Sequence, residues 1–310
     1  MKKFYNERHV ELEKMPSDLM VLDVLDRREA LDTSLKKQLS RLSAKEKGFH
    51  KVMDALRKYG KEDWTYMNSV AIDYYGIITC DLLVMTSTHL YTLEINDFEG
   101  TFELKDGVSQ LNGETLKEHP IAMAQSVLTQ LKGSKLMTPN PIHLVLKGAA
   151  IFTNKKNSLD IQDDTSDIEV VKANQIINFV KRMVREEKQA KAKTKGVTFN
   201  PMHYSWIARI DRHHPCIPIE IPDTVLKNVV PGMVCNHCHG FNVEIGEILM
   251  TCECGGWDLV EDAILRTVFE YTVLARGEKV DIPSLLEFFN NQISKEQLDK
   301  LLDKIAEEII

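Results

Sequence analysis

Four cysteines are the residues of this chain whose spacing indicates chemistry most clearly. They form two short pairs, Cys235-Asn-His-Cys238 and Cys252-Glu-Cys254, with thirteen residues between them. Each pair can bend into a knuckle that presents two thiolates, and a spacer of hairpin length can bring both knuckles to one tetrahedral zinc ion. We therefore expect one structural zinc, held by Cys235, Cys238, Cys252 and Cys254.

The second pair departs from the usual zinc spacing, because it is C-x-C rather than C-x-x-C. His237 and His239 lie beside the first pair and could replace one cysteine as a ligand. The alternative to a metal site is four free or disulfide-bonded thiols. Gly255 and Gly256 follow the second pair and favour the metal site, since glycine permits the tight, positive-φ backbone that a knuckle needs.

Two carboxylates form the second group of candidate residues. Asp81 and Glu94 each lie within an apolar run, where a charge is costly unless it is paired or bound to a metal. Two carboxylates on adjacent strands can hold Mg²⁺ or Mn²⁺, which prefer oxygen ligands and promote attack on phosphate. The alternative makes Asp81 a cap at a strand start and Glu94 a surface acid at a strand end.

The elements around these acids predict an α/β fold with a mixed central sheet and helices packed on it. Short runs rich in Val, Ile, Tyr and Thr, separated by turn residues, predict strands. Apolar residues at helical spacing predict helices between and before them. The expected strands cover residues 64–74, 77–85, 90–95, 101–104, 143–152 and 168–171, and the expected helices cover 46–59, 120–136 and 174–188.

The regions outside this sheet are expected to be helical or to surround the zinc. Leucines at helical spacing between residues 19 and 47 predict one or two amphipathic helices, which pack on their own domain or bind a protein partner. The basic residues 188–195 suit a solvated linker or helix end, with phosphate contact as the alternative. Beyond the zinc segment, residues 262–274 predict a helix, and capping boxes starting at Ser284 and Ser294 predict two more. The last helix is acidic, which suits packing or protein contact better than a DNA groove.

Composition limits the class of protein. A chain of 310 residues, 43% hydrophobic and 27% charged, is typical of a soluble protein with more than one domain. Six cysteines, four in metal spacing, favour a reducing cytoplasm over a secreted disulfide scaffold. The charged start of the chain and the lack of long apolar runs lead us to expect no signal peptide and no membrane partner. The net charge of −7 argues against nonspecific nucleic-acid binding by the whole surface, though not against a local basic groove.

The residues around Asp81 and Glu94 resemble the nuclease-related domain (NERD), a bacterial relative of the PD-(D/E)XK endonucleases. The resemblance rests on residues 81–85 and 89–100, on His119-Pro-Ile, and on Gln125 and Leu131 of the helix that follows. In this family an Asp begins one strand, Glu-Val-Lys-Asn ends the next, and a Pro…Gln helix comes after. The family also carries a C-terminal zinc segment and helices, so the resemblance covers roughly residues 40–310.

The resemblance implies a Mg²⁺- or Mn²⁺-dependent nuclease fold, with two departures from the family pattern. Asn96 stands at the position of the catalytic lysine, and an amide can donate a hydrogen bond but carries no charge. The first helix lacks a Gly-Glu pair, which leaves Glu46 or no acid in that role. Lys105 and Lys132 are candidates for a displaced lysine.

Two function classes follow. The first is a metal-dependent nuclease with a weakened site, in which Asp81, Glu94, Asn96 and Gln125 are the catalytic residues. The second is an inactive nuclease fold that binds nucleic acid or a protein through the N-terminal arm or C-terminal helices, with the zinc as a structural clip. A zinc-ribbon transcription accessory protein is a weaker third hypothesis. The expected domains are an arm (1–45), a nuclease-like domain (46–200), a linker (201–230), a zinc ribbon (231–260) and a helix-turn-helix-like unit (261–310).

Overall fold

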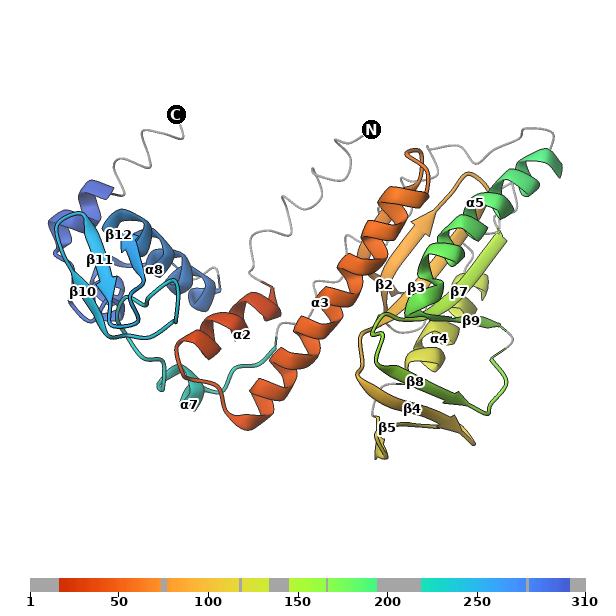
Figure 1. Cartoon of the computed structure of the whole chain (residues 1–310), viewed down its shortest axis with the longest axis horizontal. Coiled ribbons are helices and arrows are strands. Elements are labelled where there is room, and N and C mark those ends of the chain that lie inside the picture. The colour runs from red at the N-terminus through yellow and green to blue at the C-terminus, as the bar shows by residue number, and fades with distance from the viewer. Residues whose placement is uncertain are drawn as a thin grey trace. The chain divides into compact units, whose positions relative to one another are not determined.

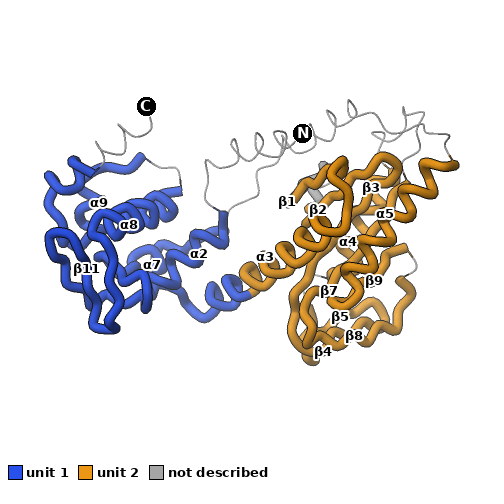
Figure 2. Tube along the Cα trace, turned by 45° about the horizontal axis from the view of Figure 1, so that its top comes forward, with its two compact units in different colours: residues 1–40, 218–310 blue, residues 41–217 orange. Residues whose placement is uncertain are grey.

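The computed structural model describes residues 17–73, 77–116, 119–133, 145–165, 167–193, 219–276 and 279–301. The chain forms two compact units, which Figure 2 shows in different colours: unit 1 comprises residues 1–40 and 218–310, and unit 2 comprises residues 41–217. The start of the expected arm, most of the expected linker and the end of the last helix (1–16, 201–218 and 302–310) lie outside the described residues. The predicted fold class is confirmed, because helices flank mixed sheets and a small antiparallel sheet carries the four cysteines.

Unit 2 is built on a five-stranded sheet in the order β1-β2-β3-β7-β9 (Figure 1). β1, β2 and β3 pair antiparallel, whereas β3, β7 and β9 pair parallel, so the sheet is mixed as predicted. The middle strands are apolar on both faces because helices cover both sides of the sheet. The strands are β1 Thr65–Asp73, β2 Ile77–Met85, β3 His89–Asn96, β7 Val145–Phe152 and β9 Ile168–Lys172.

A second sheet has four strands in the order β6-β5-β4-β8, of which β4, β5 and β6 follow β3 in the chain and β8 follows β7. The sequence analysis predicts only β4 among them. The other strands are short and contain few apolar residues among polar ones, so the sequence pattern that predicts a strand is weak there. The strands are β4 Gly100–Lys105, β5 Val108–Leu111, β6 Glu114–Thr115 and β8 Asn157–Ile161.

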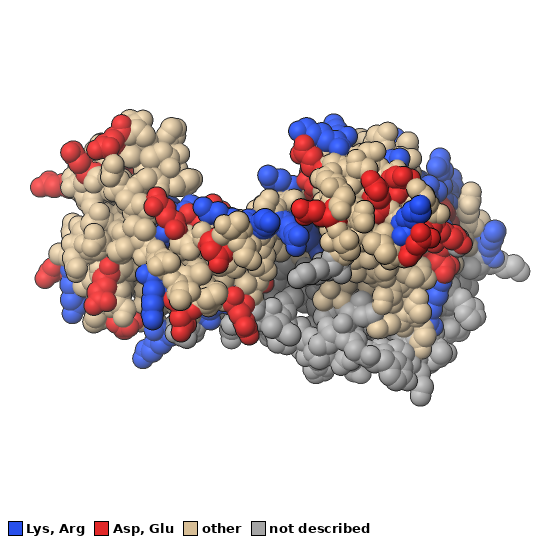
Figure 3. Space-filling view, turned by 90° about the horizontal axis from the view of Figure 1, so that it is seen from below, with Lys and Arg blue, Asp and Glu red and all other residues tan. Residues whose placement is uncertain are grey.

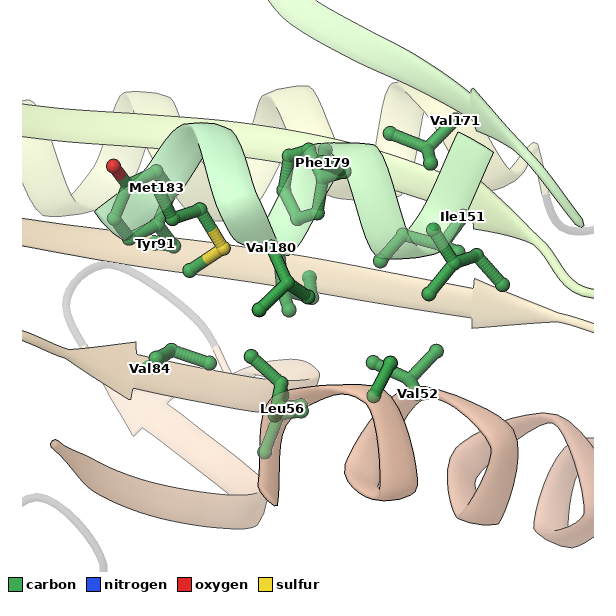
Figure 4. Packing of buried hydrophobic residues seen from close by; sticks show 14 of the residues in the cluster. Val52, Leu56, Val84, Tyr91, Ile151, Val171, Phe179, Val180 and Met183 are labelled. Carbon is green, nitrogen blue, oxygen red and sulfur yellow. The ribbon is translucent and has the colours of Figure 1, made fainter. Parts of the chain in front are cut away.

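Helices cover the five-stranded sheet on both faces. On one face Val52 and Leu56 of α3 meet Val180 and Met183 of α5 over the apolar side chains of β2, β3 and β7 (Figure 4). On the other face α4 packs on β3 and β7. The expected helix from residue 46 is not a separate element, because α3 runs unbroken across that position. The helices are α3 Thr33–Tyr59, α4 Pro120–Gly133 and α5 Ile176–Lys193, the last preceded by the short 3₁₀ helix η2 Ala173–Gln175.

Unit 1 packs helices against the three-stranded antiparallel sheet β10-β11-β12. The predicted capping box at Ser294 is confirmed, since its hydroxyl accepts from Gln297 N and its own N–H donates to Gln297 Oε1. The capping box predicted at Ser284 is wrong: Asp281 is the N-cap and accepts the N–H of Ser284, with Pro283 in the first turn. The elements are α2 Asp18–Arg27, α7 Asp223–Leu226, β10 Val243–Ile245, β11 Leu249–Cys252, β12 Trp257–Leu259, α8 Val260–Ala275 and α9 Ile282–Phe288.

A buried ion pair joins the two chain segments of unit 1. Arg28, directly after α2, and Glu270 of α8 are both fully buried. The Arg28 guanidinium donates from Nε (2.9 Å) and Nη2 (2.7 Å) to Glu270 Oε2, and from Nη1 to the carbonyl oxygens of Val230 and Gly232. Arg27 Nη1 reaches the second carboxylate oxygen at 2.7 Å. These contacts tie α2 to α8 within one core.

None of the helices within the described ranges combines the length and apolar character needed to cross a membrane.

Candidate functional site

Asp81 and Glu94 lie side by side on neighbouring strands. Leu82 of β2 pairs with Leu93 of β3, so the antiparallel register sets Asp81 opposite Glu94. This position is one residue beyond the last backbone pair of the two strands. Asp81 Oδ2 accepts the N–H of Ile95 at 2.8 Å. This side-chain hydrogen bond replaces a backbone hydrogen bond between β2 and β3, which are not paired beyond this point. Asp81 therefore uses one carboxylate oxygen for a structural contact, and its second oxygen, Oδ1, points to the side chain of Lys45.

One cation contacts both carboxylates. Lys45 Nζ of α3 lies 2.6 Å from Asp81 Oδ1 and 3.8 Å from Glu94 Oε1. The side chains of Asp81 and Glu94 are 14% and 5% exposed, whereas that of Lys45 is 46% exposed. The two acids therefore share a single cation position, which opens to solvent on the side of Lys45.

Gly48 explains how α3 brings Lys45 to this position. A Cβ at Gly48 would lie 2.8 Å from Thr153 Oγ1 and 3.2 Å from the side chain of Ile95. Only a residue without a side chain lets the helix cross the ends of β3 and β7 this closely. Lys45 precedes Gly48 by one helical turn, so its ammonium extends over the strand ends.

The sequence analysis missed Lys45 and proposed Lys105 or Lys132 as the displaced lysine. Lys105 lies exposed at the end of β4. Lys132 Nζ lies 3.8 Å from Asp167. A signal for Lys45 exists in the sequence, because it lies four residues before Phe49 and seven before Val52, in line with the apolar face of its helix.

Asn96 shares the face of β3 that carries Glu94, since side chains two residues apart on a strand point the same way. Asn96 is 9% exposed. Its Nδ2 has no hydrogen-bond partner among the described residues. A buried donor left without an acceptor costs about 1–3 kcal/mol, so this amide marks a place where an acceptor oxygen fits.

Two other predicted residues are placed elsewhere. Glu46 lies on the exposed side of α3 and pairs with His50 Nε2 at 3.0 Å. Gln125 of α4 donates to Asp167 Oδ2 at 3.2 Å and to Thr129 Oγ1 at 3.4 Å. The described contacts therefore bring Asp81, Glu94 and Asn96 to the end of β3 and tie Gln125 to the residue that precedes β9.

The buried thiol of Cys80 borders the acid pair. Burial, together with the negative charges of Asp81 and Glu94, raises the pKa of Cys80 to about 12. The thiol is therefore neutral at physiological pH and offers neither a nucleophile nor a soft metal ligand. The chemistry of this end of the sheet depends on its carboxylates, the ammonium of Lys45 and the amide of Asn96.

The four cysteines in unit 1 come together as predicted. Their sulfur atoms all lie within 4.8 Å of one another, with Cys235 and Cys254 3.7 Å apart and Cys238 and Cys252 3.6 Å apart. Zinc bound tetrahedrally at about 2.3 Å from each sulfur requires sulfur–sulfur distances of about 3.8 Å. Among the described residues the cluster consists of the four thiols, and neither His237 nor His239 is one of its members, although His237 Nδ1 lies 3.6 Å from Cys254 Sγ.

The backbone around the cluster prepares it for a cation. Sulfur atoms accept N–H groups from His237, Gly240 and Gly256, which suits thiolates better than neutral thiols. Although burial raises the pKa of Cys235, the N–H groups of Cys238 and His237 outweigh that effect and lower the pKa to about 6. The N–H of Cys254 lowers the pKa of Cys252, but burial and hydrogen bonds with the other thiols outweigh it and raise that pKa to about 12, and the pKa of Cys254 is raised as well. Gly255 has a φ of +84°, so the predicted positive-φ backbone is confirmed there, whereas Gly256 is required for another reason: a Cβ would lie 2.9 Å from His237 Cβ and 3.2 Å from Cys235 Sγ. The cluster is consistent with a structural zinc.

The fold and these residues define an α/β protein with mixed sheets and a four-cysteine cluster suited to a metal. No protein-family model matches the chain, and neither the curated proteins nor the solved structures contain a match. Its function is therefore inferred from the arrangement of its own residues.

Proposed function

We propose that unit 2 is a metal-dependent nuclease with an altered active site at the end of β3. The observation that carries this proposal is the single cation position that Asp81 and Glu94 share, at 2.6 Å and 3.8 Å from the Lys45 ammonium. Carboxylate oxygens at one solvent-open position suit Mg²⁺ or Mn²⁺. The resemblance of this strand pair to the nuclease-related domain supports the same function.

Each residue of the site has a role in this proposal. Asp81 and Glu94 hold the divalent cation, which supplies Lewis acidity and a water of lowered pKa when it is bound. Lys45 yields its position to the ion and offsets negative charge on a phosphate beside it. Asn96 offers its unpaired Nδ2–H to a water or a phosphate oxygen. Lys45 thus supplies, from the helix, the charge that Asn96 lacks.

The charge distribution on α3 supports a phosphate-bearing substrate. On the face drawn in Figure 3, Lys and Arg side chains lie among Asp and Glu side chains, in keeping with the net charge of −7. Within unit 2, however, α3 carries four exposed Lys and Arg residues and one acid between residues 41 and 51. Arg41 and Lys45 are four residues apart, so they lie about 6 Å apart along the helix. This basic strip ends at the proposed site.

A second function, an inactive nuclease fold that binds nucleic acid, has one observation in its favour. The Lys45 ammonium already neutralises part of the acid pair, as a metal ion would. In that case Lys45 is a permanent substitute for the metal, and the basic strip of α3 binds phosphates without cleavage. For both functions we propose that Cys235, Cys238, Cys252 and Cys254 hold one structural zinc that stabilises unit 1.

A cleavage assay tests these proposals. Purified protein is incubated with single- and double-stranded DNA and RNA, with Mg²⁺, Mn²⁺ or a chelator. We expect metal-dependent cleavage that Glu94→Gln abolishes and that Glu103→Gln, an exposed acid of β4, leaves intact. Asn96→Lys should raise the rate, because it adds a charge near the phosphate. No cleavage by either the parent or Asn96→Lys, with oligonucleotide binding retained, would reject the nuclease and support the binding protein.

A further inference from the structure

The small sheet of unit 1 exposes large apolar side chains on its outer face. In β11 and β12 the residues alternate, so Met250 points into the core while Leu249, Trp257 and Leu259 point outward. Leu249 pairs directly with Leu259, and Thr251 pairs with Trp257. These side chains therefore form one continuous patch across two strands.

The exposure of this patch is unusual for an isolated surface. Trp257 and Ile248 are 70% and 71% exposed, and Leu249 and Leu259 are 43% and 45% exposed. Single exposed apolar residues are common, but contiguous groups that include an aromatic residue mark interaction sites. A shallow pocket beside Trp257, lined by His237, Gly255 and Gly256, adds a depression that a partner side chain can fill.

The residues around the patch are mainly acidic, although Arg266 of α8 pairs with Asp258 at 2.7 Å and His237 lines the pocket beside Trp257. Residues 240–265 contain six acids and no Lys, Arg or His. Glu244 lies on the outer face beside Thr251, and Glu247 lies in the turn before Ile248. Glu261 and Asp262 are exposed at the first turn of α8, directly after β12. An apolar centre with an acidic rim fits a partner that has the opposite charge.

We infer that this outer face, which we call the Trp257 face (Glu244, Glu247, Ile248, Leu249, Trp257 and Leu259), binds a protein segment with apolar side chains flanked by Lys or Arg. Nucleic acid is a poor occupant because its phosphates would meet the carboxylates of Glu244 and Glu247 here. A second copy of the chain is also disfavoured, since it would bring two acidic rims together. Trp257 is the expected anchor, and the acids set the charge of the partner.

The inference is tested by selecting peptides from a random 12-residue library on the full-length, zinc-loaded protein. We expect enriched peptides with net positive charge and at least two large apolar residues. Their affinity should fall at least tenfold with Trp257→Ser and remain unchanged with Phe269→Ser, which removes an aromatic residue of α8 that is 50% exposed. Zinc content and thermal unfolding of each variant check that unit 1 remains folded.

A double charge reversal gives a second, independent measurement. The double variant Glu244→Lys with Glu247→Lys retains Trp257, and its affinity for the same peptides should be at least tenfold lower. The inference is overturned if no peptide is enriched, if the enriched peptides are acidic, or if they bind the Trp257→Ser protein equally well. It is also overturned if a single-stranded oligothymidylate binds more tightly than any peptide and depends on Trp257, because the face would then recognise nucleic acid.

Discussion

Removing the Lys45 ammonium should change stability and metal affinity in opposite directions. In the metal-free protein Lys45 stabilises unit 2 by neutralising Asp81 and Glu94. A divalent cation at the same carboxylates must displace that ammonium. Lys45→Gln therefore removes a stabilising contact and a competitor of the metal at once.

The magnitude follows from the exposure of the side chain. Lys45 is 46% exposed, so solvent screens its two ionic contacts and together they contribute about 1 kcal/mol. For a unit of this size, a loss of about 1 kcal/mol lowers the melting temperature by about 2–4 °C. In the parent protein the metal must break these contacts, which costs the same free energy of about 1 kcal/mol. The Lys45→Gln variant does not incur this cost, so its affinity for Mn²⁺ should be about fivefold higher.

Calorimetric titration with Mn²⁺ and thermal unfolding without metal measure the two effects. Lys47→Gln is the matched control, because it removes the same charge from an exposed position two residues further along α3. The reasoning fails if Lys45→Gln leaves Mn²⁺ affinity unchanged or lowers it, or if Lys47→Gln raises it as much. If Lys45→Gln lowers thermal stability and leaves Mn²⁺ affinity unchanged, Lys45 has only a structural role.

Three other expectations concern the zinc cluster and the two buried acids. Cys238→Ser should lower the zinc content from about one ion per chain to near zero and unfold the small sheet of unit 1, as elemental analysis and circular dichroism would show; full zinc content would refute it. Glu270→Gln leaves the buried Arg28 charge without its partner and should cost about 3–5 kcal/mol in denaturant unfolding, and a loss below about 1 kcal/mol would contradict that account. Desolvation alone would raise the pKa of Glu187, but hydrogen bonds from Lys61, Ser87 and Trp64 lower it from 4.5 to about 2. Its contribution of about 3 kcal/mol is therefore present above pH ~5 and lost as the pH falls toward 2, and Glu187→Gln should remove that part of the acid dependence of unfolding.

The central sheet could be predicted from sequence because its strands are buried on both faces and read as continuous apolar runs. β2, β3 and β7 have this character, whereas the edge strand β9 exposes Glu169 and Lys172. β5, β6 and β8 have too few apolar residues to be separated from turns. The cysteine cluster could be predicted because all four ligands lie within twenty residues, where spacing alone determines the geometry.

The acid site was only partly predictable, since its contacts join residues distant in sequence. Asp81 and Glu94 belong to consecutive strands, and their register follows from the apolar pattern. Lys45 comes from a helix whose position depends on a close approach at Gly48. The carboxylate of Asp81 contacts both Lys45 and the N–H of Ile95, which the sequence pattern does not indicate. For this reason Asp81→Asn should now destabilise the metal-free protein, even if Asp81 is also a metal ligand.

The Arg28–Glu270 pair has a consequence for the order of folding during synthesis. Its two residues are 242 positions apart, and the whole of unit 2 lies between them in the chain. At about 5–20 residues per second, a ribosome takes roughly 12–50 s to make Glu270 after Arg28. Unit 2 can complete its fold in that interval, whereas α2 has no α8 to pack against. The apolar residues Val21, Leu22, Val24 and Leu25 then remain uncovered on the nascent chain until α8 has been made, and exposed apolar surface of this kind is a target for chaperones.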